Sequence, residues 1–442
     1  MALKTFRGGI HPSENKHFTE DKKFTNLSIP QLCYIPLQQH IGKPAVPVVE
    51  VGDTVQEGQL VGKAEGFVSA NVHASVPGKV IEISEHPTVY SSKGLCIVIE
   101  VDGSFSTSWK KSNDNDWLTL GKEEILNRVR DAGIVGMGGA AFPTTVKLSP
   151  PENKSIDTLI INGSECEPYL TVDDLLMQTF PEEIIVGIRI TLRILGIENA
   201  AIGIENNKPK AIASLQGALK KISFNEKIEI MPLKCKYPQG AEKQLIYSIL
   251  KREVPSGGLP MDVGVVVQNV GTIFAIYEAV VLNKPLFERY LTVTGKIVDK
   301  PGNYKVRIGT KISDIINECG DLKENAVKII LGGPMCGISI DNIDIPVTKG
   351  TSGILFLSRK EVHIEDYRPC IRCGKCVSVC PVKLLPCELG NAVERDRMDL
   401  MEQLNPFDCI LCGSCTYACP SRRPILHFVK VAQEKLRAKK SA

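Results

Sequence analysis

Short apolar runs separated by turn residues dominate residues 44–101. The runs are rich in β-branched side chains, and Gly-Asp, Glu-Gly and Pro-Gly pairs punctuate them, which predicts an all-β module. Across residues 286–347, "RYLTVTGKIVDKPGNYKVRIGTKISDII" alternates apolar and polar positions and then takes a helical spacing. This second pattern predicts strands followed by a helix.

Helical spacing appears clearly in two other places. In "GKEEILNRVRDAG", Ile125 and Val129 recur on one face with charges between them, and Gly133 is a natural stop. The tail "PILHFVKVAQEKLRAKKSA" predicts an amphipathic basic helix, which fits a solvated end or a partner contact better than a membrane anchor. Between these helices, "DTLIIN" is typical of a buried strand that runs into "NGSECEPYL".

Composition sets the class of protein but selects no partner. A chain of 442 residues should divide into roughly three or four domains. Hydrophobic residues at 43% and a net charge of only +3 indicate a soluble protein without the basic footprint of nucleic-acid or anionic-membrane binding.

The most apolar windows do not predict a direct membrane span. Residues 184–204 and 263–282 are interrupted by charged or amide side chains, short of the about 20 apolar residues that a span requires. The start of the sequence has no apolar run that could form a signal-peptide core, so we expect a cytoplasmic protein.

Cysteine carries the strongest chemical signal. Nine of the fifteen cysteines lie in residues 370–419, where "CIRCGKCVSVCP" and "CILCGSCTYACP" repeat at an offset of 39 residues. We call them the first and second cysteine motifs. Both read C-x2-C-x2-C-x3-C-P, the spacing of two-cluster bacterial ferredoxins, in which the fourth cysteine of each motif ligates the other cluster. The expected ligand sets are Cys370, Cys373, Cys376 and Cys419 for one 4Fe-4S cluster, and Cys409, Cys412, Cys415 and Cys380 for the other.

Structural zinc is the alternative reading of these cysteines. Zinc motifs separate their cysteine pairs by a dozen or more residues, whereas each motif here packs four cysteines into eleven positions, so iron–sulfur clusters are favoured. Cys387 falls outside the repeat and is expected to be a packed thiol. The other six cysteines are scattered singly through apolar surroundings.

A glycine-rich loop raises a second possibility. Gly136-Met-Gly138-Gly139-Ala140-Ala141 satisfies the dinucleotide fingerprint G-x-G-x-x-G/A, but that fingerprint needs a strand before it, and here a helix precedes it. The Rossmann interpretation therefore fails. What remains is a run of small residues where backbone can approach a flat ligand or a phosphate, with a plain tight turn as the alternative.

The loop and the block after the strand carry a resemblance. "GMGGAAFPTTVK" followed by "NGSECEP", and later "YPQGAEKQLI" and "VVQNVGT", resemble the FMN- and NADH-binding flavoprotein subunit of respiratory complex I and of related hydrogenases. This resemblance implies that FMN is held by Gly136, Gly138, Gly139, Ala140, Asn162, Asn269 and Thr272. It implies a dinucleotide side formed by Phe142, Lys147, Glu165, Glu167 and Glu242, of which Lys147, Glu165 and Glu167 are the catalytic candidates.

Two departures affect these assignments. Ser164 stands where complex I commonly has aspartate, and Ala241 replaces the first glutamate of a Glu-Glu pair. The single cluster motif that follows this domain in complex I is replaced by the two cysteine motifs.

The order of the parts predicts a multidomain α/β and α+β protein. Residues 1–118 resemble the barrel-sandwich fold of biotinyl and lipoyl carriers, although the hairpin tip "EGFVSAN" lacks their modifiable lysine, so we expect a structural or docking module. Residues 119–284 would form the FMN/NADH domain and 285–358 a β-grasp, soluble-ligand-binding module. Residues 359–442 would form a ferredoxin-like domain with two 4Fe-4S clusters.

This order, with "FRGGIHPSENK" at the start, resembles the C subunits of Rnf complexes, membrane-bound ferredoxin:NAD oxidoreductases that translocate Na⁺ or H⁺. The resemblance implies a peripheral subunit at the cytoplasmic face of the cell membrane, held by membrane subunits and linked indirectly to ferredoxin. Non-covalent FMN would exchange hydride with NAD(H) and single electrons with the clusters. A soluble corrin (cobalamin) reductase and a pure electron relay without nucleotide binding are the alternatives.

Overall fold

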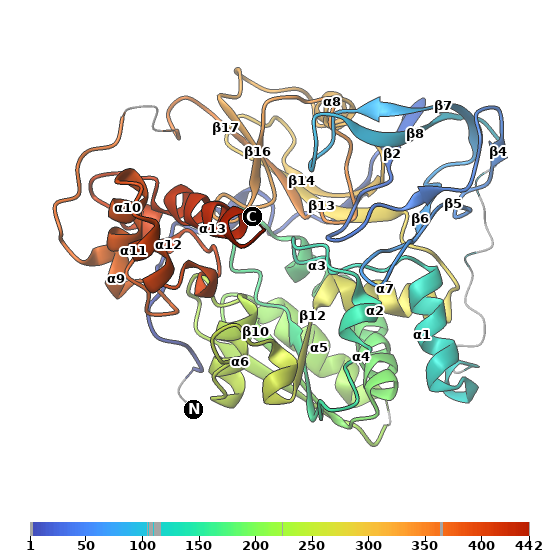
Figure 1. Cartoon of the computed structure of the whole chain (residues 1–442). Coiled ribbons are helices and arrows are strands. Elements are labelled where there is room, and N and C mark those ends of the chain that lie inside the picture. Colours follow the sequence, from blue (N-terminus) through green and yellow to red (C-terminus); the bar gives the residue numbers. More distant parts are fainter. Residues whose placement is uncertain are drawn as a thin grey trace.

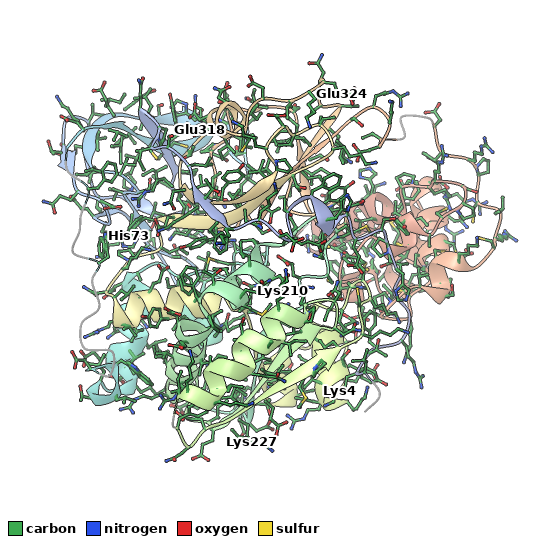
Figure 2. All side chains as sticks on the ribbon, turned by 180° about the vertical axis from the view of Figure 1, so that it is seen from behind. Lys4, His73, Lys210, Lys227, Glu318 and Glu324 are labelled. Atoms are coloured by element: carbon green, nitrogen blue, oxygen red, sulfur yellow. The ribbon has the colours of Figure 1, made fainter. Side chains whose placement is uncertain are left out.

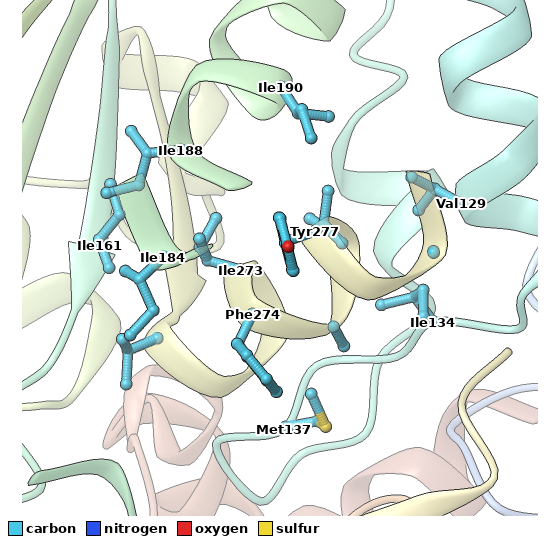
Figure 3. Close-up of a cluster of buried hydrophobic side chains, with 14 of the residues drawn as sticks. Val129, Ile134, Met137, Ile161, Ile184, Ile188, Ile190, Ile273, Phe274 and Tyr277 are labelled. Atoms are coloured by element: carbon cyan, nitrogen blue, oxygen red, sulfur yellow. The ribbon is translucent and has the colours of Figure 1, made fainter. Parts of the chain in front are cut away.

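The chain folds into four modules, seen in Figure 1 as a blue β module and an orange sheet above a green α/β domain, with a red helical domain at one side. The computed structural model describes residues 3–103, 105, 109, 116–222, 224–362 and 366–441. The α/β domain contains the buried apolar cluster drawn in Figure 3. The helical domain carries the two cysteine motifs.

The predicted all-β module is present. Two antiparallel sheets, ordered β2-β8-β7-β4 and β3-β5-β6, enclose a core that includes Val61, Val80 and Ile97. Buried and exposed side chains alternate at the start of β7, whereas β8 buries four consecutive residues on both of its faces. The strands are β2 (Leu32–Pro36), β3 (Val46–Pro47), β4 (Thr54–Val55), β5 (Leu60–Lys63), β6 (Val72–His73), β7 (Gly78–His86) and β8 (Gly94–Val101).

The α/β domain is built on a parallel sheet of order β11-β10-β9-β12. The chain moves outward from β9 through β10 to β11 and then returns to the other side of β9 with β12. This reversal makes the carboxyl ends of β9 and β12 a topological switch point, where open α/β sheets bind ligands. The strands are β9 (Thr158–Asn162), β10 (Asn199–Glu205), β11 (Lys227–Leu233) and β12 (Val265–Asn269).

Helices cover this sheet and bury its core. Figure 3 shows Ile273, Phe274 and Tyr277 of α7 among side chains from neighbouring elements. Helix α7 is apolar around most of its surface, as expected for a helix enclosed by its domain. The helices are η2 (Asp116–Thr119), α1 (Lys122–Asp131), α2 (Thr144–Lys147), α3 (Val172–Thr179), α4 (Pro181–Leu195), α5 (Pro209–Lys221), α6 (Glu242–Leu250), η3 (Pro260–Val263) and α7 (Val270–Val281).

The β-grasp part forms a six-stranded mixed sheet of order β1-β14-β13-β17-β15-β16. Its elements are η1 (Lys16–Phe18) and β1 (Phe24–Asn26) from the start of the chain, then β13 (Glu288–Thr294), β14 (Gly302–Arg307), α8 (Ile312–Glu318), β15 (Lys328–Leu331), β16 (Ile338–Ile340) and β17 (Gly353–Leu357). The predicted strands followed by a helix are therefore confirmed.

The N-terminal segment contacts several modules. β1 pairs in parallel with β14, while Lys4 bridges to Leu233 and Ile10 to Tyr237 in the α/β domain. Figure 2 labels Lys4 near the start of this segment, and His73 on the β module. The first residues thus act as a strap across later domains, a role that the predicted domain limits did not include.

The C-terminal domain is an internal repeat. Helix α9 (Lys375–Ser378) corresponds to α12 (Ser414–Tyr417), and α10 (Pro386–Glu394) starts at the position equivalent to the start of α13 (Ile425–Ser441). Helix α11 (Met398–Gln403) and η4 (Pro406–Asp408) connect the halves. The predicted tail helix is confirmed as α13, and Ala432 and Leu436 bury its apolar face.

Among the residues that the structure describes, no helix is both long enough and apolar enough to cross a membrane.

Candidate cofactor sites

The switch point places two predicted residues side by side. Asn162 ends β9 and Asn269 ends β12, and the strands pair so that these residues are direct partners. The Asn162 amide donates to the Gly240 carbonyl (2.8 Å), and its oxygen accepts from the Ser164 N–H (3.2 Å). A polar rim therefore surrounds the carboxyl edge of the sheet.

The glycine loop closes on itself beside this edge. The N–H of Gly136 donates to the Phe142 carbonyl (2.8 Å), and Thr272 Oγ1 accepts from the N–H of Met137 (2.9 Å). A helix, α1, enters the loop as predicted, so the Rossmann interpretation is excluded by the structure as well. The loop is a closed turn packed on α7, which starts at the end of β12.

The tip of the loop presents bare backbone. Gly138, Gly139 and Ala140 are exposed, and no described residue accepts a hydrogen bond from their N–H groups. A Cβ on Gly139, whose φ is +104°, would meet nothing within 4 Å, whereas one on Gly138 would lie 3.5 Å from Asn269 Cβ. Free amides without side chains can hold a flat, oxygen-rich ligand or a phosphate, so these residues fit FMN.

The other side of the loop is anchored to the β module and to the β-grasp part. Ile41 of the β module donates its N–H to the Ala141 carbonyl (3.2 Å), and Arg289 of β13 donates to the Met137 carbonyl (3.4 Å). Lys349, before β17, donates to the Gly133 carbonyl (2.7 Å). Burial lowers the pKa of the Lys349 ammonium to about 7. The three anchors hold the exposed tip in one position.

Asn269 has a structural task in this arrangement. Its side-chain oxygen caps α7 by accepting from the N–H of Gly271 (2.8 Å), and its amide donates to Asp173 (2.7 Å). Burial raises the pKa of Asp173, and the Asn269 hydrogen bond opposes that rise. An N-cap of this kind orients the first turn of α7, where Thr272 contacts the loop.

Glu165 lies at the start of helix α3. Its carboxylate accepts from the N–H of Asp173 (2.7 Å) and Asp174 (3.3 Å), while Lys16 Nζ lies 3.9 Å away. Burial raises the pKa of Glu165 to about 7 although Lys16 opposes this. The carboxylate is thus engaged by backbone donors, and its predicted contact with a dinucleotide stays a prediction.

Glu167 grips the β-grasp module. Its two carboxylate oxygens accept from the N–H groups of Cys336 (2.8 Å) and Met335 (3.0 Å), in the "LGGPMCG" loop after β15. A side chain on Gly333 would collide with this carboxylate at 2.2 Å, so only glycine allows the close approach. Burial raises the pKa of Glu167. Its role toward a dinucleotide also stays a prediction.

Lys147 and Glu242 form an ion pair. Lys147 Nζ lies 2.6 Å from Glu242 Oε1 and donates to the Val267 carbonyl of β12 (3.3 Å). The pair joins the end of α2 to the first residue of α6, and about a third of each side chain is exposed. Phe142 is half-buried at the end of the glycine loop. These residues line the same edge of the sheet as Asn162 and Asn269.

The two cysteine motifs line two small cavities that open to solvent. Each cavity is lined by three cysteines of one motif and by the fourth cysteine of the other, so the structure brings together the two expected ligand sets, whose role as cluster ligands stays a prediction. Cys370, Cys373, Cys376 and Cys419 line the first cavity. Cys380, Cys409, Cys412 and Cys415 line the second cavity.

Cysteine thiols are the metal-ligating side chains that line both cavities. Among the described residues, no three His, Cys, Asp or Glu side chains come together as ligands of a single metal ion. Tetrahedral zinc needs its sulfurs within about 4 Å of one another. Four thiolates suit either metal site, and it is the C-x2-C-x2-C-x3-C-P spacing of two-cluster ferredoxins that favours 4Fe-4S clusters over zinc.

Cys387 lies beside the cysteines of the first cavity, although it falls outside the repeat. It lines the first cavity as a fifth cysteine. Its Sγ lies 4.0 Å from Glu388 Oε1. The prediction that Cys387 is a packed thiol and not a ligand remains open to test.

A hydrogen-bonded chain connects the α/β domain to the second cavity. The hydroxyl of Tyr237 donates to the carbonyl of Cys412 (2.8 Å) and lies 2.9 Å from Cys336 Sγ. Since the hydroxyl has one hydrogen, the Cys336 thiol supplies the hydrogen of that second contact. Burial raises the pKa of Tyr237, so its hydroxyl stays protonated. Hydrogen bonds therefore run from Glu167 through Cys336 and Tyr237 to Cys412, a predicted cluster ligand.

Sequence reasoning missed several of these residues. Lys16 is buried and donates to the carbonyls of Glu165 (3.0 Å) and Glu167 (3.2 Å). Tyr237 lies within the quoted segment "YPQGAEKQLI", and Cys336 is one of the six scattered cysteines; neither had an assigned role. The sequence signal that could have found Tyr237 is its polar side chain within a segment that resembles a cofactor-binding domain. Its hydrogen-bond partners could not be found in this way, because they come from segments far away in the sequence.

Family comparisons divide the chain in the same order as the structure. Residues 4–104 match the "RnfC Barrel sandwich hybrid domain", residues 129–278 the "Nuo51 FMN-binding domain", residues 290–339 the "SLBB domain", and residues 369–422 the "4Fe-4S dicluster domain". The predicted fold class is therefore confirmed.

Curated relatives match over nearly the full length. The C subunit of the proton-translocating ferredoxin:NAD(+) oxidoreductase complex of Clostridium ljungdahlii is 47% identical over 99% of this chain and 95% of its own. The C subunit of the Na(+)-translocating complex of Acetobacterium woodii is 44% identical over 99% and 98%. Among solved structures, an air-oxidized NAD+-reducing [NiFe]-hydrogenase has a TM-score of 0.52 at 20% identity, covering 75% of this chain and 63% of its own. That likeness extends to the fold alone.

Proposed function

Because the chain belongs to the family of C subunits of ion-translocating ferredoxin:NAD(+) oxidoreductase (Rnf) complexes, we propose that it carries electrons between NAD(H) and the membrane subunits through FMN and two 4Fe-4S clusters. It is an electron-transfer, peripheral subunit of that oxidoreductase, and membrane partner subunits are expected. A corrin reductase is not favoured, because the relatives that match over the full length are C subunits.

The exposed tip of the glycine loop carries the flavin assignment. We assign FMN to Gly136, Gly138, Gly139, Ala140, Asn162, Asn269 and Thr272, which meet at the switch point. The support is the set of unpaired N–H groups at residues 138–140, held from behind by three contacts from the β module and the β-grasp part. A preorganised cradle loses little freedom when its ligand binds.

The dinucleotide side follows along the same edge. We assign it to Phe142 and to the Lys147–Glu242 pair, whose partly exposed charges can meet the polar parts of NADH. Glu165 and Glu167 act on this side as positioning residues, because their carboxylates hold backbone N–H groups of α3 and of the loop after β15. When bound, FMN exchanges a hydride with NAD(H) and single electrons with the clusters.

The second cavity is the one nearer to the flavin site. The hydroxyl of Tyr237 donates a hydrogen bond to the backbone carbonyl of Cys412, which lines the second cavity. Three residues later, the carbonyl of Gly240 accepts a hydrogen bond from the side chain of Asn162 at the switch point. The proposed electron path therefore runs from the switch point to the second cavity, then to the first cavity, and out to a partner. Asn162 and Cys412 are thus linked through one short segment.

We further propose that the subunit lies at the cytoplasmic face of the membrane. The reason is chemical: the relatives are named for NAD(+) and ferredoxin, and both are cytoplasmic electron carriers.

Flavin reduction by NADH tests the proposed function. The purified chain, reconstituted with iron, sulfide and FMN, should bleach at about 450 nm when NADH is added. A chain that binds no flavin, or binds flavin that NADH does not reduce, would contradict the proposal and leave the pure electron relay.

A glycine pair isolates the cradle from backbone effects. Gly139 (φ +104°) and Gly52 (φ +103°) share their conformation, and a Cβ at either would meet nothing within 4 Å. Gly139→Ala should weaken FMN binding because its methyl group projects into the space of the ligand. Gly52→Ala introduces the same backbone strain in the β module, away from the loop, and should leave FMN binding unchanged. Equal FMN affinity in both variants would remove the glycine loop from the flavin site.

A further inference from the structure

The two cysteine motifs differ in what covers them. Residues 371–375 of the first motif are all exposed, whereas the equivalent residues 410–414 of the second are half-buried or buried. Cys373 is exposed, and its repeat partner Cys412 is only 7% exposed. Identical spacing has therefore produced one covered face and one open face.

The covered face shows what such a surface is used for. Ile410 packs with Ile10 and Tyr237 in an apolar cluster that joins the second motif to the α/β domain. The carbonyl of Met335 lies 3.2 Å from where a Cβ on Gly413 would be. The second motif thus presents the wall of its cavity to the neighbouring domain through which electrons reach it.

The open face has a different chemical character. Ile371, the repeat partner of Ile410, is 67% exposed. Arg372 and Lys375 replace the Leu411 and Ser414 of the covered face. Both cations are exposed, and no described carboxylate lies within ion-pair distance of either.

We propose that Ile371, Arg372 and Lys375 form the docking face for a partner protein of the complex that presents an acidic surface around a one-electron redox group. This inference rests on the proposed function, because it names the partner chemistry of the exit site. An apolar centre with cations beside it suits an acidic partner, since complementary charge steers and orients association. The group held in the first cavity would be oxidised by one electron and the partner's redox group would be reduced by one electron; no proton moves, and no bond forms or breaks.

A protein fits this face better than the other occupants. Lipid attraction requires clusters of four to eight cations, and this face offers two. A second copy of the chain would bring the same two positive charges against them. A lipid surface also has no group to accept an electron from the exposed wall beside Cys373.

Charge reversal tests the docking face directly. Membranes that carry the other subunits but lack this one should bind the reconstituted wild-type chain, with an affinity that falls as salt rises. The double variant Arg372→Glu/Lys375→Glu should bind at least tenfold more weakly and lose most of the salt dependence. The matched control Arg395→Glu/Lys430→Glu changes the same charge at exposed positions of the same domain and should bind as wild type.

Two further measurements separate the outcomes. Iron content and NADH bleaching of the flavin are recorded for each variant. If the proposed function is wrong, these two measurements fail; if only the docking face is wrong, they stay normal and only the membrane-binding result differs from the expected one. If Arg372→Glu disturbs the cluster, Lys375→Glu alone should still weaken binding. Equal loss in the control pair, or equal binding to protein-free anionic vesicles, would overturn the docking face. Self-association that the same reversal abolishes would also overturn it, in favour of a second copy.

Discussion

The first and second cysteine motifs share a sequence pattern and a backbone, yet they have opposite surroundings. Arg372 and Leu411 both have positive φ, 53° and 54°, and each donates its N–H to a cysteine sulfur two residues earlier at 3.4 Å. Around this common frame, the second motif is packed against the α/β domain and the first faces outward. Local sequence thus sets how a cavity is built, and tertiary contacts set which cavity is covered by the neighbouring domain and which faces outward.

The largest effect should come from the crossing cysteines. Cys380→Ser removes a ligand from the second cavity although Cys380 belongs to the first motif, so about four of eight irons should be lost, and the lost cluster should be the one near Tyr237. Cys419→Ser should remove the other cluster. Iron and sulfide content with electron paramagnetic resonance (EPR) measures both losses.

Cys387 provides the control for this pair. It lines the first cavity, but we predict that it is not a ligand, so Cys387→Ala should keep both clusters. Loss of the same cluster from Cys380→Ser and Cys370→Ser would instead show that each motif ligates its own cluster. The predicted exchange of the fourth ligand between the two motifs would then be wrong.

Exposure should make the two clusters differ in chemical lifetime. A chelator or oxidant reaches the first cavity past exposed Cys373, whereas Cys412 and Cys415 are at most 9% exposed. We therefore expect iron release in two phases, with the first-cavity cluster lost several-fold faster. Absorbance decay followed in wild type and in the two single-cluster variants assigns the phases. One phase common to all three proteins would mean that burial does not distinguish the cavities.

A smaller effect is expected at Tyr237. Tyr237→Phe keeps the ring in its buried site but removes the hydrogen bonds to Cys412 and Cys336. Flavin retention and bleaching by NADH should be unchanged, whereas cluster reduction should slow a few-fold because the contact between the α/β domain and the second cavity loosens. Stopped-flow absorbance separates the two steps. Unchanged cluster reduction would exclude Tyr237 as a positioning residue.

The contrast also explains which features the sequence could predict. The cavities depend on spacing within and between two short motifs, and the eight cysteines named from that spacing line them, whereas Cys387 beside the first cavity was not expected there. Helix α1 and strand β9 follow from hydrophobic periodicity. Those features are local, so one sequence contains the information.

Other features depend on segments far apart in the chain. Lys16 reaches Glu165 across 149 positions, and Glu167 reaches Cys336 across 169. Neither contact leaves a periodic or motif signal, since a lysine or glutamate in a loop usually lies in solvent. The packing of Ile410 and the exposure of Ile371 are likewise invisible in a repeat where both positions are isoleucine.

The smallest effect should appear at that isoleucine pair. Ile410→Ala removes part of an apolar contact and should lower the free energy of unfolding by about 1–2 kcal/mol, whereas Ile371→Ala at an exposed position should change it by less than about 0.5 kcal/mol. Denaturant unfolding of the two reconstituted variants, run side by side, measures the difference. Equal destabilisation would show that the two faces are equally covered.

The order of the electron path is tested most directly by NADH reduction of the two single-cluster variants. After mixing with NADH and rapid freezing, the Cys419→Ser variant should still reduce its second-cavity cluster at the wild-type rate, seen by EPR. The Cys380→Ser variant should reduce its flavin normally but leave the first-cavity cluster oxidised on the same timescale. Fast reduction of the first-cavity cluster in Cys380→Ser, with slow reduction in Cys419→Ser, would contradict the proposed path.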